Sequence, residues 1–274
     1  MKITKKSNPS KGFVLVASKK FSFFIAAKNL AENILDYIPD AKVTLFTEQH
    51  WIDKHISDLD HFDQVLPTIS NGIREKMYGM ANTPYDLTLY LDCDIEIHHQ
   101  DIDTIFDQID DDTDMMWVRL TKKGARVFAE WNWGDNLLDN GYEGPPDHLS
   151  HCGGVCLYDT RNPLIKEFMT DWYSLYYQQR DNSWMPEEFK NIPNSFKQWD
   201  QLTLWWLLWH SPKYKSITWK FFKENYRWNY YTSFGFPWNE VRIPMVDKEP
   251  IIVHHSRTMD KEGTKGYLTH DDPS

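Results

Sequence analysis

The pattern that most constrains the fold is a strand, a helix and a second strand in close succession at the start of the chain. Residues 12–17, Gly-Phe-Val-Leu-Val-Ala, form an apolar run typical of a buried strand. Apolar residues then recur every three or four positions from Phe23 to Ile38, the spacing of an amphipathic helix, which Pro39 ends. A second strand is predicted at 42–46. This short spacing predicts a parallel sheet with right-handed crossovers.

The rest of the chain continues the alternation of strands and helices. Strands are expected at 85–91, 115–120, 153–158 and 251–253, and helices at 73–80, 102–109, 163–178 and 200–209. Residues 121–151 and 211–250 are expected to be irregular, and a loop as long as the first is usually functional or mobile. There is no internal repeat or linker. We therefore expect one α/β domain over residues 1–274, with a mostly parallel sheet flanked by helices.

Charge and cysteine content restrict the class of protein. The formal net charge of −10 disfavours binding to nucleic acid mainly through phosphate neutralisation. Lys2, Lys5, Lys6 and Lys11 could form a local basic patch, but a solvated N-terminal tail is the simpler interpretation. Three cysteines are too few for a disulfide framework. No apolar stretch approaches 18 residues, so we expect a cytoplasmic protein without a membrane span.

The aromatic content is high, at 15% of the residues with 13 Trp. Most of these rings should fill core volume. Some could instead line a groove and stack on a sugar ring or an exposed base. The sequence leaves both interpretations open for Trp131, Trp133, Trp184 and Trp228.

Two carboxylates follow the strand predicted at 85–91, in the sequence Asp92-Cys93-Asp94. Asp-x-Asp spacing recurs elsewhere in this Asp-rich chain, so the position of this pair is what distinguishes it. The carboxyl ends of strands are where open α/β sheets bind ligands. A divalent cation held there could neutralise the charge of a departing nucleoside diphosphate, and Mn²⁺ or Mg²⁺ suits carboxylate ligands. A solvated turn is the alternative.

These residues resemble the GT-A glycosyltransferases, in particular the glycogenin-like and bacterial galactosyltransferase-like branch. That branch has a Lys or Arg on a helix, a Pro-Tyr turn, an apolar strand and Asp-x-Asp, and Arg74 and Lys76 match the first of these. The resemblance implies that Asp92 contacts the nucleotide ribose or the metal, and that Asp94 is the firmer metal ligand. It also implies that Lys76 or Arg74 reaches the donor, although a solvated helix face would explain either residue alone.

The second half of the chain carries further parts of the resemblance. Gly153 and Gly154 resemble the family's small-residue strand, which implies close approach of the backbone to the donor sugar. Close contact between strands would also explain them. Asp200-Gln201 resembles the family's Asp-Gln pair at the reacting centre, so these are the implied catalytic residues. Alternatively, or in addition, Asp200 is an N-cap residue.

The C-terminal residues complete the resemblance. His254 follows the last predicted strand and is similar to the family's late His, which completes the metal shell. His255 is the alternative ligand, because adjacent residues on a strand point in opposite directions, and we favour His254. Lys261 and Lys265 are both candidates for the family's diphosphate-binding lysine. The family's Lys-Pro-Trp is absent, so the choice between them stays open.

The resemblance covers roughly residues 12–266 and implies a metal-dependent glycosyltransferase that uses a nucleotide-sugar, most simply a UDP-sugar. Residues 12–120 would bind this donor, and residues 150–266 would bind the acceptor and complete the metal site. A carbohydrate or glycolipid acceptor fits the acidic charge better than a nucleic-acid base does. The Asp-Gln pair favours a retaining reaction. An inverting one would need a general base, for which Asp200, Asp147 and Glu143 are candidates.

Three other functions fit the sequence less well. A nucleotidyltransferase would normally carry a Gly-rich basic loop after the first strand, and residues 17–20, Ala-Ser-Lys-Lys, contain no Gly. A non-catalytic nucleotide-sugar-binding module would be expected to lack one of the metal ligands, all of which are present. A metal hydrolase is disfavoured because no H-E-x-x-H motif occurs, and dinucleotide and P-loop motifs are also absent.

Overall fold

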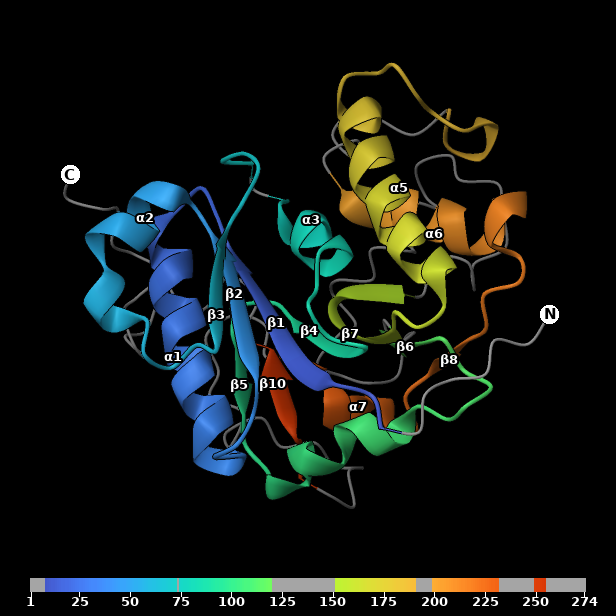
Figure 1. The fold of residues 1–274 in the computed structure, drawn as a ribbon. Coiled ribbons are helices and arrows are strands. Elements are labelled where there is room, and N and C mark those ends of the chain that lie inside the picture. The colour runs from blue at the N-terminus through green and yellow to red at the C-terminus, as the bar shows by residue number, and fades with distance from the viewer. Residues whose placement is uncertain (1–7, 73, 120–150, 191–198, 232–248, 255–274) are drawn as a thin grey trace.

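The computed structural model describes residues 8–72, 74–119, 151–190, 199–231 and 249–254. Its main element is a seven-stranded sheet with strand order β3-β2-β1-β4-β7-β6-β8 (Figure 1). Four of the six neighbouring pairs are parallel, and β7 is antiparallel to both of its neighbours. The predicted mostly parallel α/β sheet is therefore confirmed. The strands are β1 (Lys11–Ala17), β2 (Val43–Thr47), β3 (Gln64–Pro67), β4 (Leu87–Leu91), β6 (Met115–Arg119), β7 (His151–Asp159) and β8 (Trp219–Phe221).

Helices cover both faces of this sheet, and the alternation of side chains along β1 shows how (Figure 1). Phe13 and Leu15 pack in the core cluster that includes α1 (Phe21–Tyr37), whereas Val14 and Val16 pack in the cluster beneath the other helices. This period of two is what a strand buried on both faces requires. The helices on the second face are α3 (Lys76–Ala81), α5 (Pro163–Arg180) and α6 (Asp200–Trp209).

A second sheet of three strands has the order β5-β10-β9. It consists of β5 (Ile95–Ile97), β9 (Tyr230–Tyr231) and β10 (Ile252–His254). β10 pairs antiparallel with β5, so that His254 lies opposite Ile95, and parallel with β9. This pairing brings the last described residue of the chain next to the segment that follows β4.

Several elements differ from the sequence-based prediction. The helix predicted at 102–109 is a 3₁₀ helix, Gln100–Gln108, whose buried Ile102 and Ile105 have the spacing of three that suits this helix. The strand predicted to begin at 153 begins two residues earlier. Segments predicted as irregular or left unassigned contain β3, β5, β8, β9, α2 (Gln49–Lys54) and α7 (Asn225–Trp228). These elements are too short to show a periodicity, and tertiary pairing stabilises them.

Among the residues that the structure describes, the remaining helices are short 3₁₀ segments at Ile56–Asp58, Glu187–Phe189 and Pro212–Tyr214. In the part of the chain that the structure describes, no helix combines the length and the apolar character needed to cross a membrane. The predicted cytoplasmic location stays a prediction.

Gly79 determines how closely α3 approaches the sheet, and we expect its replacement to destabilise the fold. A Cβ atom at this position would lie 2.5 Å from Val16 Cγ2 and 3.1 Å from Phe46 Cδ2. Gly79→Ala should lower the free energy of unfolding by about 1–2 kcal/mol in urea titrations, because overpacking outweighs the better helix propensity of Ala. In a Val16→Ala background the same change should cost less. An equal cost in both backgrounds would contradict this packing argument.

Candidate metal and donor site

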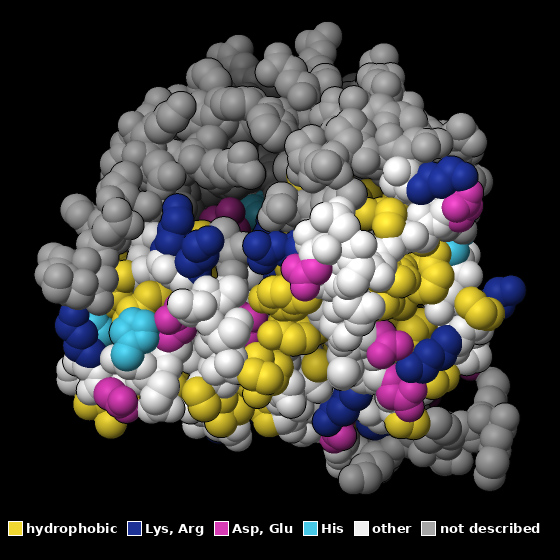
Figure 2. Space-filling view, turned by 90° about the horizontal axis from the view of Figure 1, so that it is seen from above, with side chains coloured by type: hydrophobic (Ala, Val, Ile, Leu, Met, Phe, Trp, Pro, Cys, Tyr) yellow, Lys and Arg dark blue, Asp and Glu magenta, His cyan; other side chains and the backbone are white. Residues whose placement is uncertain are grey.

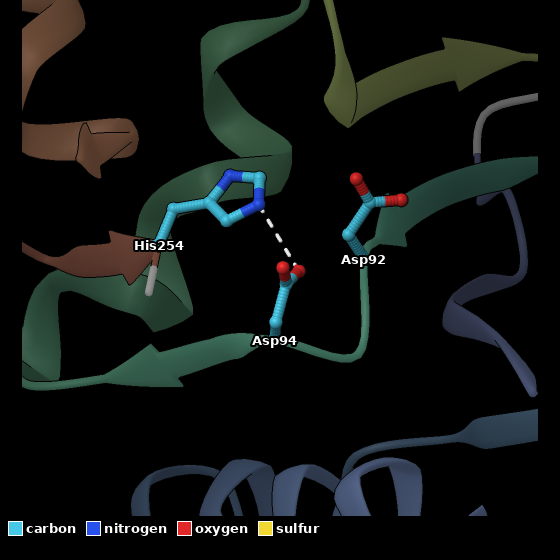
Figure 3. Close-up of side chains that lie close together, drawn as sticks. All are labelled: Asp92, Asp94 and His254. Atoms are coloured by element: carbon cyan, nitrogen blue, oxygen red, sulfur yellow. Dashed lines mark ion pairs between the residues drawn. The ribbon is translucent and has the colours of Figure 1, made fainter. Parts of the chain in front are cut away.

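Three side chains converge beyond the carboxyl end of β4 (Figure 3). Asp92 and Asp94 follow β4 directly, and His254 is the last residue of β10. One ligand atom from each lies within 4.8 Å of the others, and His254 Nε2 is 3.0 Å from Asp94 Oδ1. Among the residues that the structure describes, this is the one group of three or more His, Cys, Asp or Glu side chains whose ligand atoms come together in this way.

The backbone explains why these three residues meet. Every residue of β4 is buried, and the Asp92 amide extends the ladder by donating to Gly154 O at 2.9 Å. The chain then turns into β5, whose Ile95 pairs with His254. Asp94 precedes Ile95, so the register of this small sheet sets its distance from the imidazole. The sequence-based choice of His254 agrees with this geometry, while His255 lies outside the described residues.

Asp92 is held from two sides. Tyr90 OH donates to Asp92 Oδ1 at 2.5 Å, and Lys76 Nζ lies 3.6 Å from the same oxygen. Burial and the neighbouring Asp92 carboxylate raise the pKa of Tyr90 well above its usual value, so its hydroxyl stays protonated. The Asp92 carboxylate thus keeps a fixed orientation, with its other oxygen, Oδ2, facing Gly154.

Gly154 makes room for the cluster. A Cβ atom on Gly154 would lie 2.7 Å from His254 Cε1 and 2.9 Å from Asp92 Oδ2. The same test on Gly153 places a Cβ 3.3 Å from Lys76 Nζ and 3.4 Å from the Trp172 ring, which is tight but not prohibitive. Close packing therefore requires glycine at 154 much more strictly than at 153.

Electrostatics favour a charged cluster. Burial, the largest single influence, would raise the pKa of the Asp94 carboxyl, but the charge and hydrogen bond of His254 together with nearby Lys76 lower this pKa overall. Burial, again the largest single influence, would lower the pKa of the His254 imidazole, but the charges of Asp94 and Asp92 and the hydrogen bond to Asp94 together raise this pKa. Two carboxylates and one imidazole form a mixed oxygen and nitrogen donor set, and Gly154 leaves the space between them unfilled. The residues therefore fit a divalent cation such as Mn²⁺ or Mg²⁺.

A second charged cluster adjoins the first. Lys76 begins α3, and its Nζ lies 2.8 Å from Asp200 Oδ2 and donates to Gly153 O at 3.2 Å. Arg74 Nε lies 3.8 Å from Asp200 Oδ1. Lys76 is 7% exposed and Asp200 is 1% exposed, so the alternative of a solvated helix face is wrong for Lys76.

The alternative capping role of Asp200 is also wrong, because α6 begins at Asp200 and its N-cap residue is Trp199. The carboxylate instead forms buried ion pairs. Burial alone would raise the pKa of Asp200, but Arg74 and Lys76 together lower it to about 2. Asp200 is therefore fully ionised at neutral pH, at the start of α6 and facing Lys76 of α3 and Arg74 of the preceding turn.

Glu75 is part of the site that sequence reasoning missed. It is fully buried between the two predicted donor-binding cations and accepts from Ser70 Oγ at 2.7 Å, Tyr177 OH at 2.8 Å and Tyr173 OH at 3.1 Å. These contacts tie the turn before α3 to α5. No local pattern could have predicted them, because both tyrosines lie about a hundred residues away along the chain.

The structure also places Gln201 and two of the candidate groove tryptophans. Gln201 is partly exposed in the first turn of α6. Trp228 is 4% exposed within the hydrophobic core, so it packs there rather than lining a groove, and Trp184 packs edge-to-face on Trp206. Outside the described residues lie Lys261, Lys265, Trp131, Trp133, Glu143 and Asp147.

Figure 2 looks down on the molecule from above the view of Figure 1. Lys and Arg side chains lie beside a recess in which acidic and His side chains are visible. Cations and anions are thus adjacent on this face.

Comparison with known proteins gives structural matches only. No protein-family model and no curated protein matches the sequence. The glycosyltransferase GlyE of Streptococcus pneumoniae TIGR4 has a TM-score of 0.53 and 13% identity over 89% of this chain and 54% of its own. The apo bifunctional glycosyltransferase WbbM has a TM-score of 0.54 and 11% identity over 92% and 47%. The galactosyltransferase LgtC, solved with donor and acceptor sugar analogs, has a TM-score of 0.51 and 12% identity over 89% and 87%.

This chain spans about half the length of GlyE and of WbbM, but most of the length of LgtC. At 11–13% identity the likeness is one of fold. It agrees with the mostly parallel sheet and its flanking helices. The chain therefore has the GT-A fold that the sequence resemblance predicted.

Proposed function

We propose that the chain is a metal-dependent glycosyltransferase that moves a sugar from a nucleotide-sugar, most simply a UDP-sugar, to an acceptor hydroxyl. The observation that carries this proposal is the Asp92, Asp94 and His254 cluster at the carboxyl end of β4 in a GT-A fold. Open α/β sheets bind ligands at this edge. The complete ligand set favours an enzyme over a non-catalytic binding module.

In this proposal Asp92, Asp94 and His254 hold Mn²⁺ or Mg²⁺. The ion, when bound, neutralises charge on the departing nucleoside diphosphate. Tyr90 orients Asp92 for this role through its 2.5 Å hydrogen bond. Gly154 keeps open the space that the cation needs.

We assign donor binding to Arg74, Lys76 and the strand segment Gly153–Gly154. Lys76 lies between the metal cluster and Asp200, 3.6 Å from Asp92 Oδ1 and 2.8 Å from Asp200 Oδ2. Its ammonium group can therefore face an anionic donor without leaving either carboxylate unpaired. Lys261 or Lys265 would add positive charge at the diphosphate.

Asp200 and Gln201 begin α6 and are the proposed residues at the reacting centre. A carboxylate whose pKa is held at about 2 is a poor proton acceptor. The ion pairs of Asp200 thus disfavour an inverting reaction in which this residue is the general base. They are compatible with a retaining reaction, in which Asp200 orients the donor sugar and its charge stabilises positive charge developing on that sugar.

We further propose that residues 12–120 bind most of the nucleotide-sugar, and that residues 150–266 bind the acceptor and complete the metal site. Asp200 and His254 come from the second part and meet Lys76, Asp92 and Asp94 from the first. The site therefore forms only when both parts fold together. A carbohydrate-type acceptor is the proposed partner.

Donor and metal binding should be visible in a thermal-shift screen of nucleotide-sugars with Mn²⁺ or with a chelator. A ligand that binds only the folded state raises the melting temperature, by an amount equivalent to about 2.7 kcal/mol at 100 times its Kd. We expect one donor to do so only with Mn²⁺. Asp94→Asn should remove this shift and lower sugar transfer at least about 100-fold. The substitution weakens binding of the metal ion, which would stabilise charge in the transition state by roughly several kcal/mol.

Asp103→Asn is the matched control, because Asp103 ends a second Asp-x-Asp sequence and is itself exposed, on the 3₁₀ helix Gln100–Gln108. It should leave binding and transfer unchanged. The absence of any nucleotide-dependent shift in the wild-type protein would refute the transferase assignment. Metal-dependent binding of a donor without transfer to any acceptor would instead identify a binding module.

The two neighbouring glycines provide a second test. Gly154→Ala should weaken Mn²⁺ binding by at least about tenfold, because its methyl group would displace both His254 and Asp92 from their ligand positions. Gly153→Ala should change Mn²⁺ affinity little, since its methyl group would meet the Lys76 ammonium group at 3.3 Å and the edge of Trp172 at 3.4 Å, and neither is one of the three metal-site side chains. Isothermal titration with Mn²⁺ measures both. Equal effects of the two substitutions would count against the assigned metal position.

Asp200 also supports stability, which a substitution can measure. Asp200→Asn leaves Lys76 and Arg74 without their buried carboxylate, so we expect a loss of about 3–5 kcal/mol in denaturant unfolding. Lys220→Met, which removes the exposed pair with Asp110, should cost at most about 1 kcal/mol.

The pH dependence of this loss has a defined sign. The pKa of Asp200 falls from an ordinary 3.8 to about 2 in the folded protein, so its contribution is complete above pH 4 and is lost as pH falls toward 2. The difference in unfolding free energy between wild type and Asp200→Asn should therefore shrink between about pH 4 and pH 2. A difference that stays constant over this range would show that the stability does not come from the charged carboxylate.

A further inference from the structure

The second ring nitrogen of His254 has a partner that the proposed metal site does not use. His254 Nδ1 lies 3.0 Å from Asn229 Oδ1. Both residues are buried, with His254 2% and Asn229 5% exposed. Asn229 lies between α7 and β9, and β9 pairs with β10 through Tyr231 and His254, so the amide is held beside the imidazole by the small sheet.

The other end of the Asn229 amide determines its orientation. Asn229 Nδ2 donates to Cys152 Sγ at 3.7 Å, and Cys152 is a free, buried cysteine on β7. With its NH₂ group directed at the sulfur, the amide presents its carbonyl oxygen to the ring. A carbonyl oxygen only accepts, so the proton of this contact belongs to His254 Nδ1.

This arrangement fixes which nitrogen of His254 is available. When the proton is on Nδ1, the neutral imidazole has its lone pair on Nε2. Nε2 is the atom that lies 3.0 Å from Asp94 Oδ1 and faces the carboxylate pair. The opposite tautomer would direct an N–H at the cation position and leave a lone pair facing the amide oxygen.

We propose that Asn229 is a positioning residue for the metal centre, which holds His254 as the Nδ1–H tautomer with Nε2 directed at the ion. This inference rests on the proposed metal-dependent function. Among the described residues, the polar contacts of the Asn229 side chain are with His254 and Cys152, so it would act on the ion through the imidazole. Partners of this kind typically contribute a factor of 10–100 in metal affinity.

Mn²⁺ titration without nucleotide, followed by electron paramagnetic resonance, tests this role. Asn229→Leu removes the acceptor at nearly constant volume and should weaken Mn²⁺ binding about 10–100-fold. Asn229→Asp keeps an acceptor and should bind Mn²⁺ at least as well as wild type. Cys152→Ala removes the partner that orients the amide but keeps the acceptor, so it should weaken Mn²⁺ binding less than Asn229→Leu does. Equal loss of affinity in Asn229→Leu and Asn229→Asp would show a packing role and overturn the proposal.

The tautomer can be read independently of transfer. In the metal-free protein the Asp94 carboxylate, 3.0 Å from Nε2, competes for the imidazole proton, so the spectra are recorded with saturating Mg²⁺, which is diamagnetic. Long-range ¹H–¹⁵N spectra, assigned with His254→Gln, should then show Nδ1–H for His254 in the wild type and in Asn229→Asp. A wild-type spectrum of the Nε2–H tautomer with Mg²⁺ present would overturn the proposal even if Asn229→Leu failed to fold. Mn²⁺ binding that depends on Asn229 without sugar transfer would refute the proposed function alone. Transfer with an unchanged Mn²⁺ affinity in Asn229→Leu would refute this inference alone.

Discussion

The antiparallel pairing of β5 with β10 is the contact on which the site depends. Asp92 and Asp94 follow a buried strand and would lie at the same sheet edge in many α/β proteins. The third residue of the cluster comes from a distant part of the chain, and the register that places His254 opposite Ile95 puts its Nε2 3.0 Å from Asp94 Oδ1. Asn229 enters through the same small sheet, because β9 pairs with β10. The pairing of β10 therefore sets both the position of the His254 imidazole and the position of the Asn229 amide beside it.

A second constraint is the balance of buried charge. Lys76 and Asp200 are nearly inaccessible to water, and each would be costly to bury without the other. Their ion pair joins the start of α3 to the start of α6, while Glu75 and its three hydroxyl donors join the adjoining turn to α5. Cations and anions are thus held in a fixed order around the carboxyl end of β4. Such an order suits an anionic ligand that bridges a metal and a lysine.

Elements with a clear periodicity were predictable, and short paired elements were not. The unit β1-α1-β2 follows from apolar runs and a helical repeat, and α6 was predicted with the bounds that the structure shows, 200–209. β5 and β9 have three and two residues, so neither carries a periodic pattern of its own. Their strand conformation comes from hydrogen bonds to β10, which are non-local and have no local sequence signal. The same reason explains why Glu75 and Asn229 were missed.

The sequence by itself determined the class of fold, the position of the carboxylate pair at a strand end, and the residue types from which a metal site could be built. Hydrophobic periodicity and local motifs suffice for these, because they depend on neighbours along the chain. Only the tertiary structure decided that Lys76 and Asp200 are a buried pair, that Gly154 makes room for His254 and Asp92, and that His254 lies against Asn229. Each of these depends on distances between segments far apart in sequence, and those distances are set by the packing of the whole sheet and its helices.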